Sequence, residues 1–200
     1  HREYDAAIIG ANCMSLTPAQ ESIIRAYILS QPALAAQPMN SDGADAIAGV
    51  LNAAAAPTFT VWQLRTPVDV IFDAIVWANF TPSDAPPAVD AGAPAFSARA
   101  HACQGKQANL RLLLTSPDGM VSSSRVNIRA GFDDCLKQIP SGAGGALRNA
   151  GSVAVSDAMK RTASQYEKLL ATGTGSFAAP ATMGVEGPVG AATIQVIRAS

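Results

Sequence analysis

The chain has 200 residues, of which 48 % are apolar, 14 % charged and 6 % aromatic, and its formal net charge at pH 7 is −1. This near-neutral balance argues against bulk nucleic-acid binding, which needs a strongly basic surface, and no run of about 18 apolar residues is present that could span a membrane. Much of the apolar content is alanine, which favours closely packed helices over a bulky β-sandwich core. We therefore expect a mainly α protein: a bundle of about five to six helices with a minor β element and an extended C-terminal tail.

The charge is divided unevenly along the chain. Residues 1–100 contain four Lys or Arg and nine Asp or Glu, a balance of −5, whereas residues 101–200 contain ten and six, a balance of +4. Two interpretations are open. The asymmetry suits ordinary solvated helix faces, and it also suits a polar subunit whose acidic part meets the basic part of a neighbour.

Three cysteines, Cys13, Cys103 and Cys135, form no Cys-x-x-Cys pair. An odd number without that spacing argues against a disulfide framework and against a zinc knuckle. Cys103 and Cys135 fall at apolar positions of predicted helices, which favours small buried side chains in a reducing compartment.

The first residues of the chain stand apart from the rest. The chain begins with His1, and Met14 opens the stretch Met-Ser-Leu-Thr-Pro, which would suit a natural start. We expect residues 1–14 to be an N-terminal extension, with a genuine N-terminal arm as the alternative. A helical body over residues 15–172 and an extended C-terminal docking tail over residues 173–200 would follow.

Two helices are predicted before residue 55. Residues 17–20, Thr-Pro-Ala-Gln, form a capping box with proline at the first helical position, and apolar residues at helical spacing follow as far as Pro32. A second, shorter helix opens at residues 41–45, where the acidic side chains suit the positive end of the helix dipole. The apolar faces consist of Ile23, Ile24, Tyr27 and Ile28 in the first helix and of Ile47, Val50 and Leu51 in the second.

A strand and a third helix come next. Residues 58–64 are rich in β-branched and aromatic types and predict a strand. Thr66 and Pro67 repeat the capping pattern, and the four prolines in residues 81–95 predict a loop after the helix that they start. The apolar residues of that helix are Val68, Ile71, Phe72, Ile75 and Val76.

Three longer helices are predicted in the second half. The fourth carries an apolar seam from Phe96 to Leu114, and a proline–glycine turn at residues 116–119 separates it from a fifth helix over about 123–139. The sixth, over about 147–171, is the longest, and Gly173 is its expected C-cap. Its apolar side chains are Val155, Met159, Ala163, Tyr166 and Leu170.

The tail is rich in Gly, Ala, Pro and Thr and has no pattern that could build a core of its own. A segment of this kind packs onto something else. The alternation over residues 193–197 would suit a strand added to the sheet edge of a partner, and a tail folded back on its own bundle is the alternative. The expected partner-binding side chains are Met183, Val185, Val189, Ile194, Val196 and Ile197.

We predict no catalytic, cofactor-binding or metal-binding residue and therefore no enzymatic activity. His101 is the one histidine outside the N-terminal extension, so no second histidine can complete a metal site. The glycine-rich residues 141–145 lack both the Lys-Ser/Thr of a P-loop and the acidic residue of a dinucleotide site. Asp69 and Asp73 share a helix face but have no visible third ligand.

Other conspicuous residues also suit structural roles. Asp133 and Asp134 are adjacent on a predicted helix and point roughly 100° apart, so the two carboxylates do not converge on one reacting group. Trp62 and Trp77 are interpreted as anchors of a core or of an interface.

Distinctive strings occur in order along the chain. They are residues 127–133 (Asn-Ile-Arg-Ala-Gly-Phe-Asp), 160–163 (Lys-Arg-Thr-Ala), 167–175 and 180–187, together with residues 32–44 and the pair Val61 and Trp62. The series resembles a family of small proteins encoded among the virion and morphogenesis genes of tailed phages and prophages of Gram-negative bacteria. The resemblance spans most of residues 17–187 and is poor in the middle loop and the last dozen residues.

The resemblance implies a structural or assembly part of the phage particle, with no known catalytic role. We expect a head-to-tail connector (adaptor) subunit that forms a ring at the portal. Its partners would be other copies of itself and portal or other neck or tail proteins, in passive proximity to packaged DNA. It would be assembled in the bacterial host cytoplasm and located in the virion. The alternatives are a capsid-associated or tail-completion protein and, from another class, a small helical regulatory or DNA-binding protein, for which no good recognition helix is evident.

Overall fold

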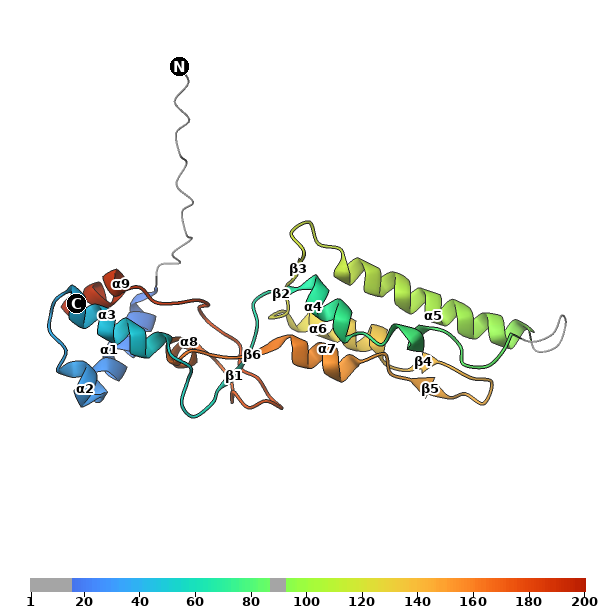
Figure 1. The fold of residues 1–200 in the computed structure, drawn as a ribbon, viewed down its shortest axis with the longest axis horizontal. Helices are drawn as coiled ribbons and strands as arrows, with labels where there is room; N and C mark the ends of the chain where they lie inside the picture. The colour runs from blue at the N-terminus through green and yellow to red at the C-terminus, as the bar shows by residue number, and fades with distance from the viewer. Residues whose placement is uncertain (1–15, 87–92) are drawn as a thin grey trace, which may run out of the picture. The chain divides into compact units, whose positions relative to one another are not determined.

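The computed structural model describes residues 16–86 and 93–200 (Figure 1). The expected N-terminal extension, residues 1–14, lies outside the described residues. Within them the chain is mainly helical, as predicted, with short two-stranded antiparallel sheets, and no helix is long and apolar enough to cross a membrane. In place of about five to six helices, these residues form nine α-helices, which are divided between two compact units.

The first unit is formed by residues up to Ala54, by Ser164–Leu170 and by Gly184–Ser200. Its helices are α1 (Pro18–Ser30), α2 (Pro32–Ala35), α3 (Ser41–Asn52), α8 (Gln165–Leu170) and α9 (Ala191–Ala199). The predicted capping box starts α1, since the backbone N–H of Gln20 donates to Thr17 Oγ1 (3.3 Å) and the N–H of Thr17 donates to Gln20 Oε1 (2.9 Å).

Helix α3 is tightly fitted at its first turn. The side chain of Asn40 caps it by accepting from the N–H of Gly43 (3.0 Å). A Cβ atom at Gly43 would lie 2.1 Å from the backbone oxygen of Pro38, so this position requires glycine. The core of the unit joins α1, α3, α8 and α9 through Ile24, Ile28, Leu34, Ala44, Ile47, Ala48, Leu51, Tyr166, Leu170, Val189, Ile194 and Ile197.

The predicted extended C-terminal tail is wrong. Residues 191–199 form the helix α9, which packs against α3 in the same chain (Figure 1). Ile194 and Ile197 are fully buried, and their spacing of three residues suits one face of a helix better than the strand that was expected. Asn52 on α3 fixes the approach to α9: its Nδ2 donates to Val189 O (2.9 Å), and its Oδ1 accepts from Val189 N–H (2.8 Å).

The second unit is formed by Ala55–Ala163 and Ala171–Met183. Its elements are β1 (Thr60–Trp62), β2 (Thr66–Pro67), α4 (Val68–Ala74), the 3-10 helix η1 (Trp77–Phe80), α5 (Ala93–Leu114), β3 (Met120–Val121), α6 (Val126–Leu136), β4 (Ile139–Pro140), β5 (Leu147–Arg148), α7 (Ser152–Ala158) and β6 (Lys160–Thr162). Strand β1 pairs with β6, β2 with β3 and β4 with β5. The predicted strand and the predicted fourth and fifth helices therefore correspond to β1, α5 and α6.

The core of the second unit lies among α4, α5, α6 and α7, which pack side by side (Figure 1). Cys103 and Leu110 of the predicted seam on α5 are buried there, as are Phe132 and Cys135 on α6. The remaining buried members are Ile71, Ile75, Phe80, Val121, Leu136, Ile139, Ala150, Val155 and Met159.

Two sequence-based predictions fail in this unit. Thr66 does not cap the third helix, because it belongs to β2 and its hydroxyl hydrogen-bonds to that of Ser123. The predicted sixth helix over 147–171 is broken into α7, β6 and α8. Residues 160–162 adopt an extended conformation and pair with β1. Ser164 then starts α8 with a second capping box, in which the backbone N–H of Glu167 donates to Ser164 Oγ (3.2 Å).

Candidate interaction site

Parts of four of the distinctive sequence strings meet around Trp62 in the second unit. In the antiparallel pairing of β1 with β6, Val61 faces Arg161 and Trp62 faces Lys160. A third segment joins them, because Val61 forms a parallel bridge with Ala181 and the backbone N–H of Trp62 donates to Ala181 O (3.0 Å). Segments separated by up to 120 residues in the sequence are thus hydrogen-bonded to one another.

Two cations stack on the indole ring of Trp62. The guanidinium carbon of Arg129, from α6, lies 4.1 Å from the ring centroid, and Lys160 Nζ lies 5.5 Å from it. Lys160 Nζ is also 4.3 Å from the ring of Phe177 and 2.8 Å from Asp157 Oδ1, and the lysine side chain is only 10 % exposed. Each such cation–π contact contributes about 0.5–2 kcal/mol, so the cluster ties α6, β1, β6 and the loop that carries Phe177 together.

Arg129 is held in place without a counter-ion. Its Nη1 donates to the backbone oxygens of Ser123 and Ser124, both at 2.7 Å, and it forms no ion pair within the described residues. Burial lowers the pKa of the guanidinium, which nevertheless stays charged because an arginine side chain does not deprotonate in proteins. The remaining Arg129 N–H groups can donate to an incoming acceptor.

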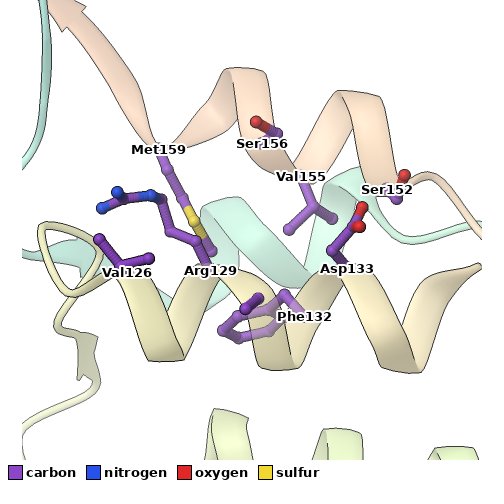
Figure 2. A pocket seen from close by; sticks show the side chains of 9 residues that line it. Val126, Arg129, Phe132, Asp133, Ser152, Val155, Ser156 and Met159 are labelled. Atoms are coloured by element: carbon purple, nitrogen blue, oxygen red, sulfur yellow. The ribbon is translucent and has the colours of Figure 1, made fainter. Parts of the chain in front are cut away.

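A cavity of about 270 Å³ lies beside this arginine, between α6 and α7. Figure 2 shows Arg129 and Asp133 projecting from α6, with Ser152 and Ser156 on the facing helix. Each pair is spaced four residues apart, which places its members on the same helix face. The apolar lining consists of Val126, Ala130, Phe132, Val155 and Met159.

Several polar groups that line this cavity already have partners within the chain. Asp133 is already paired with Lys137 Nζ (2.8 Å), and Ser152 Oγ accepts from Asn149 Nδ2 (3.2 Å). No group of three or more His, Cys, Asp or Glu that could hold a metal ion occurs in the part of the chain that the structure describes. An apolar lining with a few polar groups suits a docked side chain or peptide segment.

The structure does not gather the expected partner-binding residues into one surface. Val189, Ile194 and Ile197 lie in the core of the first unit, where Val185 packs half-buried against them, and Val196 is 61 % exposed. Met183 belongs to the second unit, half-buried, with its Sδ 3.1 Å from Arg161 Nη2. Three of the six side chains are therefore enclosed by their own chain.

Other residues singled out in the sequence stay apart. His101 is exposed on α5, and Asp69 and Asp73 are exposed on α4. Residues 141–145 form the turn of the β4–β5 hairpin, in which Ser141 N–H donates to Ala146 O (2.9 Å), instead of preceding a helix. The hairpin turn accounts for the glycine residues of this segment, so a phosphate-binding loop is not needed to explain them.

Sequence reasoning missed Arg129 and Phe177 as parts of the site. Each contact joins side chains from separate segments, Arg129 of α6 with Trp62 and Phe177 with Lys160, and no local sequence pattern signals such a pairing. Comparison of the chain with models of protein families, with curated proteins and with solved structures finds no match.

Proposed function

We propose that the chain is a non-catalytic structural and assembly protein of a tailed bacteriophage particle, in the first instance a head-to-tail connector subunit that forms a ring at the portal. The observation that supports this best is the exposure of large apolar side chains. Of the six phenylalanines only Phe80 and Phe132 are buried, while Phe72 and Phe177 are 49 % and 60 % exposed. A chain so poor in aromatic residues thus places two of them on its surface.

Aliphatic side chains add to this exposed surface in both units. Met39 in the first unit and Leu112 and Val126 in the second are 72 %, 75 % and 71 % exposed. Burying such surface contributes roughly 25 cal/mol per Å², and aromatic anchors dominate the energetics of many interfaces. Exposed apolar side chains of this size are what a subunit covers when it assembles.

The assignment to a tailed bacteriophage particle rests on the family resemblance. Four of the strings that carry it meet around Trp62, which supports treating those four as parts of one structural unit. Residues 32–44 and 167–170 belong to the first unit. The expected partners are other copies of the chain and portal or other neck or tail proteins, and the expected location is the virion. A capsid-associated or tail-completion protein would share the same apolar surface.

Two measurements test this function. The mass of the purified full-length chain, measured by light scattering and native mass spectrometry, should correspond to a closed oligomer, and negative-stain images should show rings. Quantitative mass spectrometry on tailed particles released by a strain that encodes the chain should find it in particles, enriched in fractions that retain the neck. Enrichment with isolated tails would favour a tail-completion protein, and absence from every particle fraction would refute a virion function.

A further inference from the structure

One helix of the second unit presents an acidic and apolar face that the described residues of the unit leave exposed. On α4 the side chains of Asp69 and Asp73 are exposed and take part in no ion pair within the described residues. Beside them Phe72 is 49 % exposed, and Val76, just beyond the helix, is 46 % exposed. Acidic and apolar groups therefore alternate around the free side of α4, which we call the α4 face.

The α4 face is held rigidly from behind. The rings of Phe72 and Trp77 lie 4.6 Å apart between centroids, and Trp77 Nε1 donates to the backbone oxygen of Phe72 (3.2 Å). Trp77 in turn lies 5.9 Å from the buried ring of Phe80. A side chain ordered in this way loses little conformational entropy when it is buried by a partner, which is typical of an interface anchor.

The first unit carries a groove with the opposite charge. A cavity of about 310 Å³ is lined by Met39, Asn40, Gln195, Arg198 and Ala199. A neighbouring cavity of about 120 Å³ shares Met39 and Arg198 with it and adds Arg25, Ile28, Leu29 and Ala35. We call the two together the Arg25–Arg198 groove. Its lining contains two cations and no carboxylate, and Leu29 and Met39 on it are 65 % and 72 % exposed.

Among the residues that the structure describes, no carboxylate pairs with either arginine in the groove. Arg198 donates through Nη2 to Gln37 O (2.7 Å) and through Nη1 to Pro38 O (2.8 Å), which fixes its position and leaves its charge uncompensated. Arg25 takes part in no ion pair among the residues that the structure describes. The groove thus matches the α4 face in both respects: two cations meet two carboxylates, and an apolar lining meets a phenylalanine and a valine.

We infer that the α4 face of one copy docks into the Arg25–Arg198 groove of a second copy. The two surfaces differ, so the contact is heterologous, and repetition of a heterologous contact yields a ring or a filament. This inference deepens the proposed function, on which it rests in part, by naming the surfaces through which copies of the chain meet. The occupant is a second copy because both complementary surfaces belong to the same chain.

Charge reversal on each side tests the contact. Asp69→Arg/Asp73→Arg places like charges against the groove, and Arg25→Glu does the same from the other side, so each variant alone should self-associate at least about tenfold more weakly in sedimentation velocity. A mixture of the two variants should recover the contact in part, because the unaltered α4 face of the Arg25→Glu chain finds the unaltered groove of the other variant. The reversed α4 face meets a groove that keeps Arg198 and has no net charge, so mixed dimers should form more readily than closed rings. The matched control Asp45→Arg/Asp134→Arg reverses two exposed carboxylates outside both surfaces and should assemble like the unaltered chain.

Cysteine cross-linking covers the case in which a charge variant folds poorly. In a Cys13→Ser background, Phe72→Cys chains mixed with Met39→Cys chains should form disulfide-linked dimers under mild oxidation, whereas Leu112→Cys mixed with Met39→Cys should not. No cross-link above this control, or assembly unchanged by either charge variant, would overturn the contact. Rings that persist in the charge variants would leave the proposed assembly function intact, whereas an unaltered chain that stays monomeric would refute both.

Discussion

Glu167 offers a direct test of how the first unit is held together. This carboxylate is only 3 % exposed. One oxygen accepts from the backbone N–H of Ser164 (2.9 Å), which starts α8, and the other accepts from the N–H of Gly187 (3.0 Å), in the segment that leads to α9. The side chain therefore joins two segments of the first unit that are separated by a passage through the second.

The expected cost of removing this side chain follows from these two bonds. A hydrogen bond to a charged group contributes roughly 1.5–3 kcal/mol, and a buried donor left without a partner costs a similar amount. Glu167→Ala should therefore lower the free energy of unfolding by about 3 kcal/mol or more, which corresponds to a fall in melting temperature of roughly 6–12 °C. Glu167→Gln keeps one acceptor oxygen, so its melting temperature should lie between those of Glu167→Ala and the unaltered chain.

Thermal unfolding followed by circular dichroism at 222 nm measures this series. The matched control is Asp45→Ala, which removes an exposed carboxylate from α3 in the same unit and should change stability by less than about 0.5 kcal/mol. If Glu167→Ala has the same melting temperature as the Asp45→Ala control, the two hydrogen bonds of Glu167 do not stabilise the first unit as argued.

Four further outcomes are expected. Asn52→Ala breaks both hydrogen bonds to Val189, so amide hydrogen exchange over residues 188–199 should become faster, whereas unchanged exchange would contradict the clamp. Gly43→Ala forces a Cβ atom to 2.1 Å from the backbone oxygen of Pro38, so the urea midpoint of unfolding should fall. A midpoint no lower than that of the unaltered chain would contradict this fit. Burial raises the pKa of the Cys103 and Cys135 thiols, so both should react slowly with a disulfide reagent until urea is added. Since the raised pKa favours folding only while the unfolded thiols stay protonated, unfolding titrations should show stability falling as the pH rises through about 9, the ordinary thiol value.

The first half of the chain was largely predictable because its signals are local. The capping box at Thr17 satisfies backbone N–H groups within one turn, and the structure reproduces it. The same motif at Ser164 and Glu167 is hidden in the sequence, because apolar residues at helical spacing continue across it from Val155 to Leu170. What breaks that helix is the pairing of β6 with β1, and this depends on residues about one hundred positions away.

The prediction of an extended C-terminal segment was wrong for a related reason. Five residues from 193 to 197 fit both an alternating and a helical period, and the deciding factor is the apolar face of α3, on which Ile194 and Ile197 are buried. The candidate site shares this dependence on distant partners. Arg129 has nothing in its neighbouring sequence to distinguish it, and it becomes part of the site only because folding brings Trp62 beneath it.

The route of the chain through the two units has a consequence for biosynthesis. Residues 55–163 of the second unit are contiguous, whereas the first unit combines its N-terminal helices with α8 and α9. During translation the helices α1 and α3 leave the ribosome early, but their apolar faces stay uncovered until Ile194 and Ile197 have emerged. The unit that begins the sequence is therefore the last to close, which reverses the usual order of domain folding on the ribosome. The nascent chain exposes those faces until α9 has been synthesised, and a chaperone that binds apolar surface would act in that interval.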